Sequence, residues 1–490
     1  MNARKRNITI ALMVAMFLGA VEGTVVTNAV PTIVRDLKGF ELISWVFSLY
    51  LLTSAVSTPI YGKLADLYGR KNILSIGIVI FLIGSCLCGL SQNMYQLIAF
   101  RTLQGLGAGS IFTITYTIVG DVFTFEERAK IQGWLSTVWG VASLMGPFLG
   151  GFLIDNLSWH WIFFINLPFG ILSVILLEKY LKEDFEKKKP RIDYLGTIVL
   201  SISIVILLYG FLTGEKSKLG YTNTVILCML ISFSLFLLFY FIEKRVIEPI
   251  IPFEVFTRTS TIVNIISFFT AATLIAMDVY IPIYVQNVLG YSATISGFSM
   301  APMSITWLLS SFILAKSIPR YGEKVVVAIS TLILLASCLL LPTLGINSPL
   351  LLVIIYACIM GFGFGGCFTT LTIVVQSSVD FTKRGVATST NALVRTLGQT
   401  IAVSVFGGVF NLSIVKYFSN IGIKGVEPNN LYSDMALNSG ITPDNIKASL
   451  NSGLHTLFIM LILIIIICVG LSLTLSSSLK NKKAIKKEFV

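Results

Sequence analysis

A charged side chain is costly inside a long apolar run, and this sequence places several there. Three of them are Glu22, Arg101 and Asp278. A charged group in hydrocarbon costs about 2.5 kcal/mol or more, so it is rare there without a partner or a purpose. A carboxyl group can bind and release a proton, whereas an arginine needs a wet cavity or an acidic partner. We therefore take these three residues as the centre of any chemistry in the chain.

Each of the three residues also has a simpler explanation. Glu22 could lie close enough to the outer membrane interface to reach water. Arg101 could extend to the outer headgroups, because its helix enters the membrane from that side. Asp278 could lie near the outer end of its helix and be satisfied by the local backbone or by water. Only the packing of the helices separates these alternatives.

A second set of polar side chains could line a cavity near these charges. The set comprises Thr24, Asn28, Gln104, Asn391, Arg395 and Gln399. Gln104 follows Arg101 by about one helical turn, and the last three are spaced by four residues, which places them on one helix face. Thr24 and Asn28 share the stretch EGTVVTNAVP with Glu22. We expect the Glu22 side chain to face the interior of a helix bundle.

The elements that position these residues are membrane helices. The chain has 490 residues, of which 55% are hydrophobic and 12% are charged, whereas a soluble domain has about 25% charged residues. A spanning helix needs about 20 mostly apolar residues. Fourteen runs meet this requirement: 8–30, 42–61, 72–90, 94–120, 131–154, 161–179, 194–213, 222–242, 261–286, 295–315, 325–343, 349–375, 388–415 and 453–477. We interpret the first run as a retained helix rather than a signal peptide.

The distribution of charge gives the orientation. The net charge of +12 would suit a nucleic-acid-binding protein, but the lysines and arginines concentrate in alternate connecting segments and in the tail KNKKAIKKE. This asymmetry places those segments in the cytoplasm. With an even number of spans, both termini are cytoplasmic, and no nucleic-acid partner is expected.

The sequence shows no pattern typical of a metal site or of ATP hydrolysis. Its seven cysteines are scattered through apolar runs without metal-ligand spacing. His160 and His455 are isolated, and we interpret both as loop or interface residues. The glycine-rich phosphate-binding motif of P-loop ATPases does not occur. We therefore expect no metal and no cofactor.

The stretch GKLADLYGRK, residues 62–71, is predicted to be a short polar loop between two membrane helices. Gly62 and Gly69 allow tight turns, while Arg70 and Lys71 keep the loop in the cytoplasm. Asp66 can accept hydrogen bonds from a helix N-terminus or pair with an arginine. The stretch could latch one helix bundle to another, or it could simply be a positively charged loop.

The run 131–154 contains GVASLMGPFLGG in its second half. Pro147 follows Gly146 within the membrane and is expected to bend the helix. The other glycines, Gly140, Gly150 and Gly151, leave a smooth face on which another helix can pack closely.

Internal similarity predicts two copies of a six-helix unit. Tyr68 and Gly69 align with Tyr321 and Gly322, Lys71 aligns with Lys324, Arg128 aligns with Arg384, and QGLGAGS aligns with MGFGFGG. The second copy has Pro319 in place of Asp66 and Ala357 in place of Arg101. This asymmetry suggests that ion coupling lies mainly in the first copy.

These copies define the expected domains. Residues 1–180 form the first six-helix bundle. Residues 181–258 hold a charged linker and two inserted helices. Residues 259–490 form the second bundle, with an external loop at 416–452.

The motifs together resemble the major facilitator superfamily of transporters, and in particular its fourteen-helix drug–proton antiporters. The resemblance rests on EGTVVTNAVP, GKLADLYGRK, RTLQGLG, GPFLGG and WHWIFFINLPFG, which occur in that family's order. It implies an all-α membrane protein of the major facilitator fold. Where the family usually has Asp and Asn, this chain has Glu22 and Thr27, so an acidic group is kept but its reach differs.

The resemblance also implies a mechanism. It implies a monomeric exporter in a bacterial plasma membrane, driven by the proton gradient, with two bundles rocking around a midplane cavity. Glu22 and Asp278 would contact protons or cations, Arg101 would couple protonation to conformation, and Asp66 with Arg70 would gate the cytoplasmic side. Aromatic and methionine side chains would accept varied hydrophobic, cationic drugs.

Other functions are compatible with parts of the pattern. A dedicated proton-coupled exporter of one metabolite, peptide or lipid-like compound would share these motifs, since they do not report the breadth of the pocket. A receptor or scaffold without transport would be expected to lose its intramembrane charges and to gain a soluble signalling domain. An enzyme is disfavoured because the sequence has no nucleophile–base or metal constellation.

Overall fold

The computed structural model describes residues 3–123, 125–181, 193–213, 221–246, 253–379, 384–423 and 441–475, with four isolated positions at 249, 426, 428 and 431. The side chains of Asp66 and Pro147 lie outside this description, although the backbone of both is helical. Every regular element in the described ranges is a helix. The expected all-α class is therefore confirmed.

The helices follow the expected order. The first half comprises α1 (Ala3–Leu37), α2 (Ile43–Tyr68), α3 (Arg70–Gly89), α4 (Met94–Val122), α5 (Phe125–Asn156), α6 (Trp161–Phe164) and α7 (Asn166–Tyr180). The inserted pair is α8 (Tyr194–Thr213) and α9 (Tyr221–Glu243). The second half comprises α10 (Arg258–Ile283), the π-helical turn η4 (Tyr284–Val288), α11 (Ala293–Tyr321), α12 (Glu323–Leu340), α13 (Leu350–Ser377), α14 (Arg384–Asn420) and α16 (Pro443–Leu473).

These helices are long enough to cross a bilayer. Among the described residues, 13 helical segments are long and apolar enough to span a membrane. They cover all the expected runs except 131–154. The 32-residue helix α5 occupies that remaining run, so the order of fourteen predicted spans is retained.

The stretch 62–71 differs from the predicted loop. It is helical except at Gly69, which is the only residue between α2 and α3. Gly69 has φ 89°, a conformation that side chains with a Cβ rarely adopt. One glycine thus reverses the chain, and Gly62 and Arg70 belong to helices. Gly322, its counterpart between α11 and α12, has φ 86°.

The predicted external loop 416–452 is helical at both ends. Helix α14 continues to Asn420, and α16 begins at Pro443, ten residues before the predicted start at 453. The side chain of Thr442 accepts a hydrogen bond from the backbone amide of Asn445 at 3.2 Å. A threonine cap followed by proline starts a helix even in a polar segment. The hydropathy pattern alone missed this amphipathic extension.

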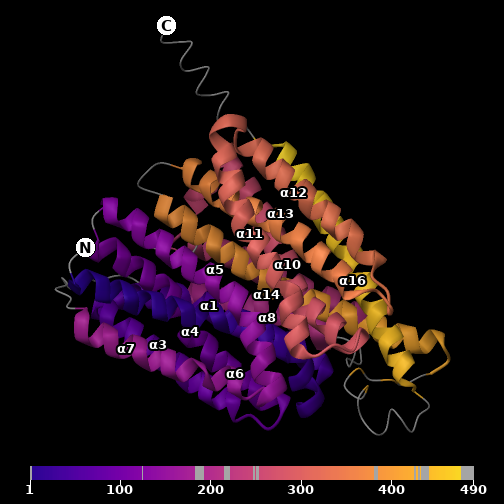
Figure 1. Ribbon diagram of the computed structural model, residues 1–490. Coiled ribbons are helices and arrows are strands. Elements are labelled where there is room, and N and C mark those ends of the chain that lie inside the picture. The colour runs from indigo at the N-terminus through magenta and orange to yellow at the C-terminus, as the bar shows by residue number, and fades with distance from the viewer. Residues whose placement is uncertain are drawn as a thin grey trace.

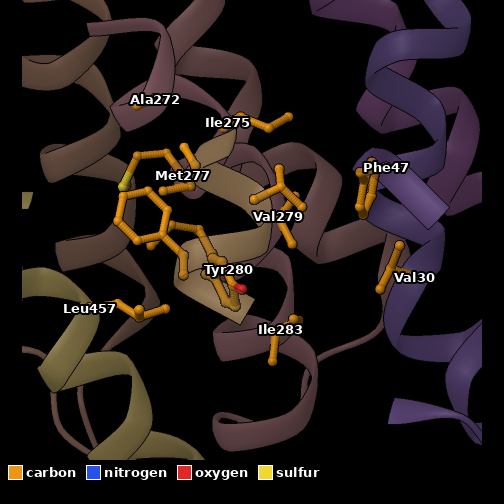
Figure 2. Packing of buried hydrophobic residues seen from close by; sticks show 14 of the residues in the cluster. Val30, Phe47, Ala272, Ile275, Met277, Val279, Tyr280, Ile283 and Leu457 are labelled. Atoms are coloured by element: carbon orange, nitrogen blue, oxygen red, sulfur yellow. The ribbon is translucent and has the colours of Figure 1, made fainter. Parts of the chain in front are cut away.

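The two halves pack side by side, with the first half in indigo to magenta and the second in salmon through orange to yellow (Figure 1). Their shared face joins α5 to α11, α2 to α14 and α1 to α10. Figure 2 shows Val30 and Phe47 of the first half opposite Val279 and Ile283 of α10, within one buried apolar cluster. The main core therefore crosses the boundary between the halves.

The inserted helix α8 packs against α9 and against both halves. It contacts α2 on one side and α14 on the other. Leu52 of α2 and Leu200 of α8 belong to one apolar cluster, against which Leu393 of α14 packs. The inserted pair is thus attached along the seam between α2 and α14.

Glycines give the same register in both halves. A Cβ on Gly107 would approach the backbone of Phe81 on α3, and a Cβ on Gly363 would approach Leu334 on α12. The neighbouring glycines pack in the same way. Gly105 and Gly109 of α4 pack against α2, and Gly361 and Gly365 of α13 pack against α11. The aligned motifs QGLGAGS and MGFGFGG therefore perform the same task, which is close helix packing.

Candidate functional site

A buried ion pair joins Glu22 of α1 to Arg101 of α4. Each residue is 1% exposed. The Arg101 Nη1 donates to Glu22 Oε1 and also to Gln104 Oε1, the latter at 2.7 Å. The helical spacing of Arg101 and Gln104 puts both side chains beside α1. Arg101 is thus directed into the bundle and not towards headgroups.

The second oxygen of the same carboxylate is held from α7. Asn166 Nδ2 donates to Glu22 Oε2 at 2.6 Å and to the Ser85 hydroxyl of α3 at 3.0 Å. Ser85 in turn donates to the backbone carbonyl of Phe163 at 2.8 Å. The hydrogen-bond network around Glu22 therefore joins four helices of the first half, α1, α3, α4 and α7.

An aromatic ring covers the arginine. The Arg101 guanidinium carbon lies 3.9 Å from the ring centroid of Tyr50 on α2, a cation–π contact. Sequence reasoning missed Tyr50, Ser85 and Asn166. Asn166 could have been found, because it is a lone amide within the apolar stretch WIFFINLPFG.

Two buried hydrogen-bond donors near Glu22 are unpaired among the described residues. Arg101 Nε and Gln104 Nε2 are buried and have no hydrogen-bond partner among the described residues. The carboxylate of Glu22 accepts from Arg101 and Asn166, whereas a protonated Glu22 would lose the charge that holds Arg101. The chemistry available here is therefore a switch between an ion pair and a neutral acid beside a free arginine.

Asp278 stands apart from this network. It lies on α10, partly exposed, and has no hydrogen bond or ion pair among the described residues. Its neighbour Met277 lines a small apolar cavity together with Ala357. Ala357 occupies the position that aligns with Arg101, so the arginine partner is absent from this place in the second half.

The three residues of α14 share a face, but Asn391 and Arg395 contact different helices. Asn391 Nδ2 donates to Asn264 at 2.8 Å and to Ser267 at 3.0 Å, both on α10. Arg395 instead reaches α13. Gln399 is partly exposed, and its side chain makes no hydrogen bond within the described residues. The helical spacing was read correctly, but it does not produce one cluster.

Thr24 and Asn28 are used in packing and in contacts between the halves. The Thr24 hydroxyl donates to backbone carbonyls of its own helix and to that of Ala142 on α5 at 3.4 Å. Asn28 Nδ2 donates to the carbonyl of Ala293 on α11 at 2.8 Å. Gln286 of η4 donates to the Asn28 carbonyl at 2.9 Å.

The glycines of α5 serve two interfaces. A Cβ at Gly146 would meet Thr24, and one at Gly150 would meet Val25, both on α1. A Cβ at Gly151 would meet the backbone of Ala293, while one at Gly140 would meet Leu308 on the same helix, α11. The smooth face was predicted for one helix, and it accepts helices from both halves.

The halves are also tied together where α1 ends. Arg35 Nη2 donates to Asn287 Oδ1 of η4 at 2.5 Å. The amide of Thr294 on α11 donates to Asp155 of α5 at 2.9 Å. With the Asn28 contacts, these bonds close this end of the molecule, which the predicted orientation places outside.

The stretch 62–71 makes a contact within the first half. Lys71 of α3 pairs with Glu178 of α7 at 2.7 Å. Gly62 faces Thr113 of α4, with 4.0 Å to an added Cβ. The gating contact predicted for Asp66 involves a side chain outside the described residues, so it stays a prediction.

Comparison with known proteins defines the class. The model of the Major Facilitator Superfamily matches residues 12–403, and the chain belongs to this family of membrane transporters, which is not a family of enzymes. The predicted family is therefore confirmed. The chain is accordingly a multi-pass membrane protein that carries small molecules.

Relatives narrow the comparison. The chain is 36% identical over 429 residues to "Multidrug resistance protein 3" of Bacillus subtilis, covering 86% of this chain and 83% of that one. It is 30% identical over 430 residues to "Multidrug efflux pump SdrM" of Staphylococcus aureus, covering 87% and 93%. Both relatives are named for drug resistance or efflux.

A solved structure shares the fold. It is a bacterial homolog of the human lysosomal transporter Spinster, in an inward-facing and unoccupied conformation. The TM-score is 0.70 at 15% identity, with 96% of this chain and 97% of that chain covered. This likeness supports the architecture alone.

Proposed function

We propose that this protein is a proton-driven antiporter that exports hydrophobic, cationic drugs across a bacterial plasma membrane. The observation that carries the proposal is the buried Glu22–Arg101 pair. Ionisable residues in a membrane interior are costly and therefore rare, and they commonly mark functional sites. The relatives named for multidrug efflux favour drugs as cargo. The protein works as a single chain with both termini in the cytoplasm.

The switch in this proposal is the proton on Glu22. In the structure, the carboxylate binds Arg101 of α4 and Asn166 of α7 while the end of α1 is closed against the second half. Protonation removes the charge that Arg101 needs, so it weakens the link between α1 and α4. Because α1 also carries the contacts of Asn28 and Arg35 to the second half, a shift of α1 changes the closed end.

In this proposal, Asp278 binds the cationic substrate. It is an acidic residue of the second half that makes no ion pair with the described residues. A cationic substrate supplies the charge that this carboxylate lacks. The bundles then rock between two facing states, of which the proton favours one and the cation the other.

The test uses everted vesicles energised to an acidic interior, with a pH-sensitive dye inside. Ethidium added to vesicles with the unaltered protein is expected to raise the interior pH as protons leave in exchange. Glu22→Gln is expected to abolish this response and Asp278→Asn to reduce it at least severalfold. Asp444→Asn, which changes an exposed carboxylate at the start of α16, should respond normally.

The proposal fails if ethidium and other hydrophobic cations evoke no proton movement with the unaltered protein. A normal response in Glu22→Gln would remove the coupling role from this carboxylate. Immunoblots of the vesicles establish that each variant is present at equal amount.

A further inference from the structure

Arg395 of α14 is a second arginine within the membrane, and unlike Arg101 it makes no ion pair among the described residues. Its Nη2 donates to the backbone carbonyl of Phe368 at 3.2 Å and to the hydroxyl of Thr372 at 3.0 Å. Its Nε is buried and has no hydrogen-bond partner in the described part of the chain. The described residues include no carboxylate in ion-pair distance of it.

Among the described residues, the positive charge of Arg395 therefore meets only neutral acceptors. Neutral acceptors stabilise a guanidinium less than a carboxylate does, and a guanidinium fork fits the two oxygens of an acid. Arg101 in the first half shows the compensated case, since Glu22 lies against it. Arg395 is partly exposed, so a ligand can approach it.

The same guanidinium lies over the edge member of an aromatic cluster, Phe368. The guanidinium carbon lies 4.6 Å from the ring centroid of Phe368. Phe368 is stacked on Trp307 of α11, with 5.1 Å between centroids and 12° between planes. Phe364 lies 5.6 Å from Trp307. Trp307 and Phe368 are both partly exposed, so they offer flat apolar surface beside a positive charge.

The backbone holds these rings in place. A Cβ on Gly365 would collide with the backbone of Trp307, so α11 and α13 touch directly here. Ser311 of α11 also donates to the Gly365 carbonyl at 3.2 Å. The stacked pair therefore rests on a close helix contact, and α14 supplies the charge.

From these contacts we infer that Arg395, Phe368 and Trp307 form a recognition site for planar aromatic compounds that carry an acidic group. The acid binds the guanidinium, and the ring system stacks on the aromatic pair. This inference rests on the proposed export function and extends its cargo from cations to aromatic acids and zwitterions. The site lies in the second half, whereas the Glu22 network lies in the first.

The test measures binding to the purified protein, followed through quenching of tryptophan fluorescence. The probes are 9-anthracenecarboxylate, its neutral methyl ester and ethidium. The unaltered protein is expected to bind the acid more tightly than the ester. Arg395→Gln should weaken binding of the acid by about tenfold or more, because a hydrogen bond to a charged group is lost, and should change binding of the ester by less than about twofold.

Two further variants keep the test sharp. Arg395→Lys retains the charge but loses the planar fork. Its affinity for the acid should therefore fall between those of the unaltered protein and Arg395→Gln. Phe368→Leu should weaken acid and ester alike, because it removes the stacking surface. Arg320→Gln, at an exposed arginine on the same molecule, serves as the matched control and should bind all probes normally. Equal binding of acid and ester by the unaltered protein would overturn the inference.

The result is separable from the proposed function. If Arg395→Gln loses the acid but keeps proton release on addition of ethidium, both proposals stand. If the unaltered protein binds the acid but ethidium moves no protons, the site remains and the cationic antiport proposal fails. If Arg395→Gln binds the acid as well as the unaltered protein does, the inference fails whatever ethidium does. Benzoate and acetate are added as competitors of 9-anthracenecarboxylate. If acetate displaces this acid as effectively as benzoate does, the site is an unselective anion site, and the proposed recognition of aromatic rings is contradicted.

Discussion

The two halves of this transporter share their packing and differ in their charges. In the first half, Glu22 and Arg101 are each 1% exposed and bind one another. In the second half, Asp278 and Arg395 are partly exposed and are not paired with an opposite charge among the described residues. The first half satisfies its charges internally, whereas the second leaves them for other groups.

The shared packing is precise to single residues. Gly77 of α3 faces Ser110 of α4, and a Cβ on Gly77 would overlap that hydroxyl. In the second half, a serine stands on α12 and a glycine on α13, since a Cβ on Gly366 would approach the Ser330 hydroxyl. The small and larger residues have exchanged sides while the helices stay in contact. The comparison teaches that helix packing is retained while the chemistry of the two halves differs.

The largest difference is expected when each arginine is removed. Arg101→Ala leaves the Glu22 carboxylate buried without its counter-ion, which costs about 3–5 kcal/mol. Arg395→Ala removes two hydrogen bonds to neutral acceptors and the cation–π contact with Phe368, and should cost less, about 1–2 kcal/mol. The shifts in melting temperature of the purified variants in detergent, each compared with the unaltered protein, rank the two costs. Equal destabilisation by the two substitutions would contradict the division into paired and unpaired charges.

A smaller and equal effect is expected in the shared scaffold. Gly105→Ala places a methyl group against the backbone of Tyr50, and Gly361→Ala places one against the backbone of Met303. Backbone cannot rotate away, so each should destabilise the protein by about 1–3 kcal/mol. Gly470→Ala, whose Cβ meets nothing within 4 Å, is the control. Unequal shifts in melting temperature for Gly105→Ala and Gly361→Ala would show that the two packings are not equivalent.

The sequence predicted the helices well because each span must be apolar over about 20 residues. The hydropathy of the sequence predicts a span at 194–213, and α8 covers Tyr194–Thr213. Polar extensions were missed, since α16 begins within a segment that hydropathy assigns to a loop. The helix–glycine–helix connection at Gly69 was also missed, because charged residues next to glycine resemble a loop.

The candidate site was predictable only in part. Glu22 and Arg101 stood out because charges in apolar runs are rare. Their pairing depends on how α1 and α4 pack, and that is not visible in the spacing along the chain. Asn166 and Tyr50 reach the site from α7 and α2, so nothing local to Glu22 announces them. Thr24 and Asn28, close to Glu22 in sequence, turned out to contact α5 and α11.

The most direct test of the account is proton release from the purified protein in weakly buffered detergent solution, measured with a pH electrode as ethidium is added. If the proton on Glu22 and the substrate exclude one another, the unaltered protein releases protons on binding and Glu22→Gln binds ethidium without releasing them. Asp444→Asn should release protons as the unaltered protein does. Undiminished release from Glu22→Gln would show that the coupling proton resides elsewhere and would contradict the central claim.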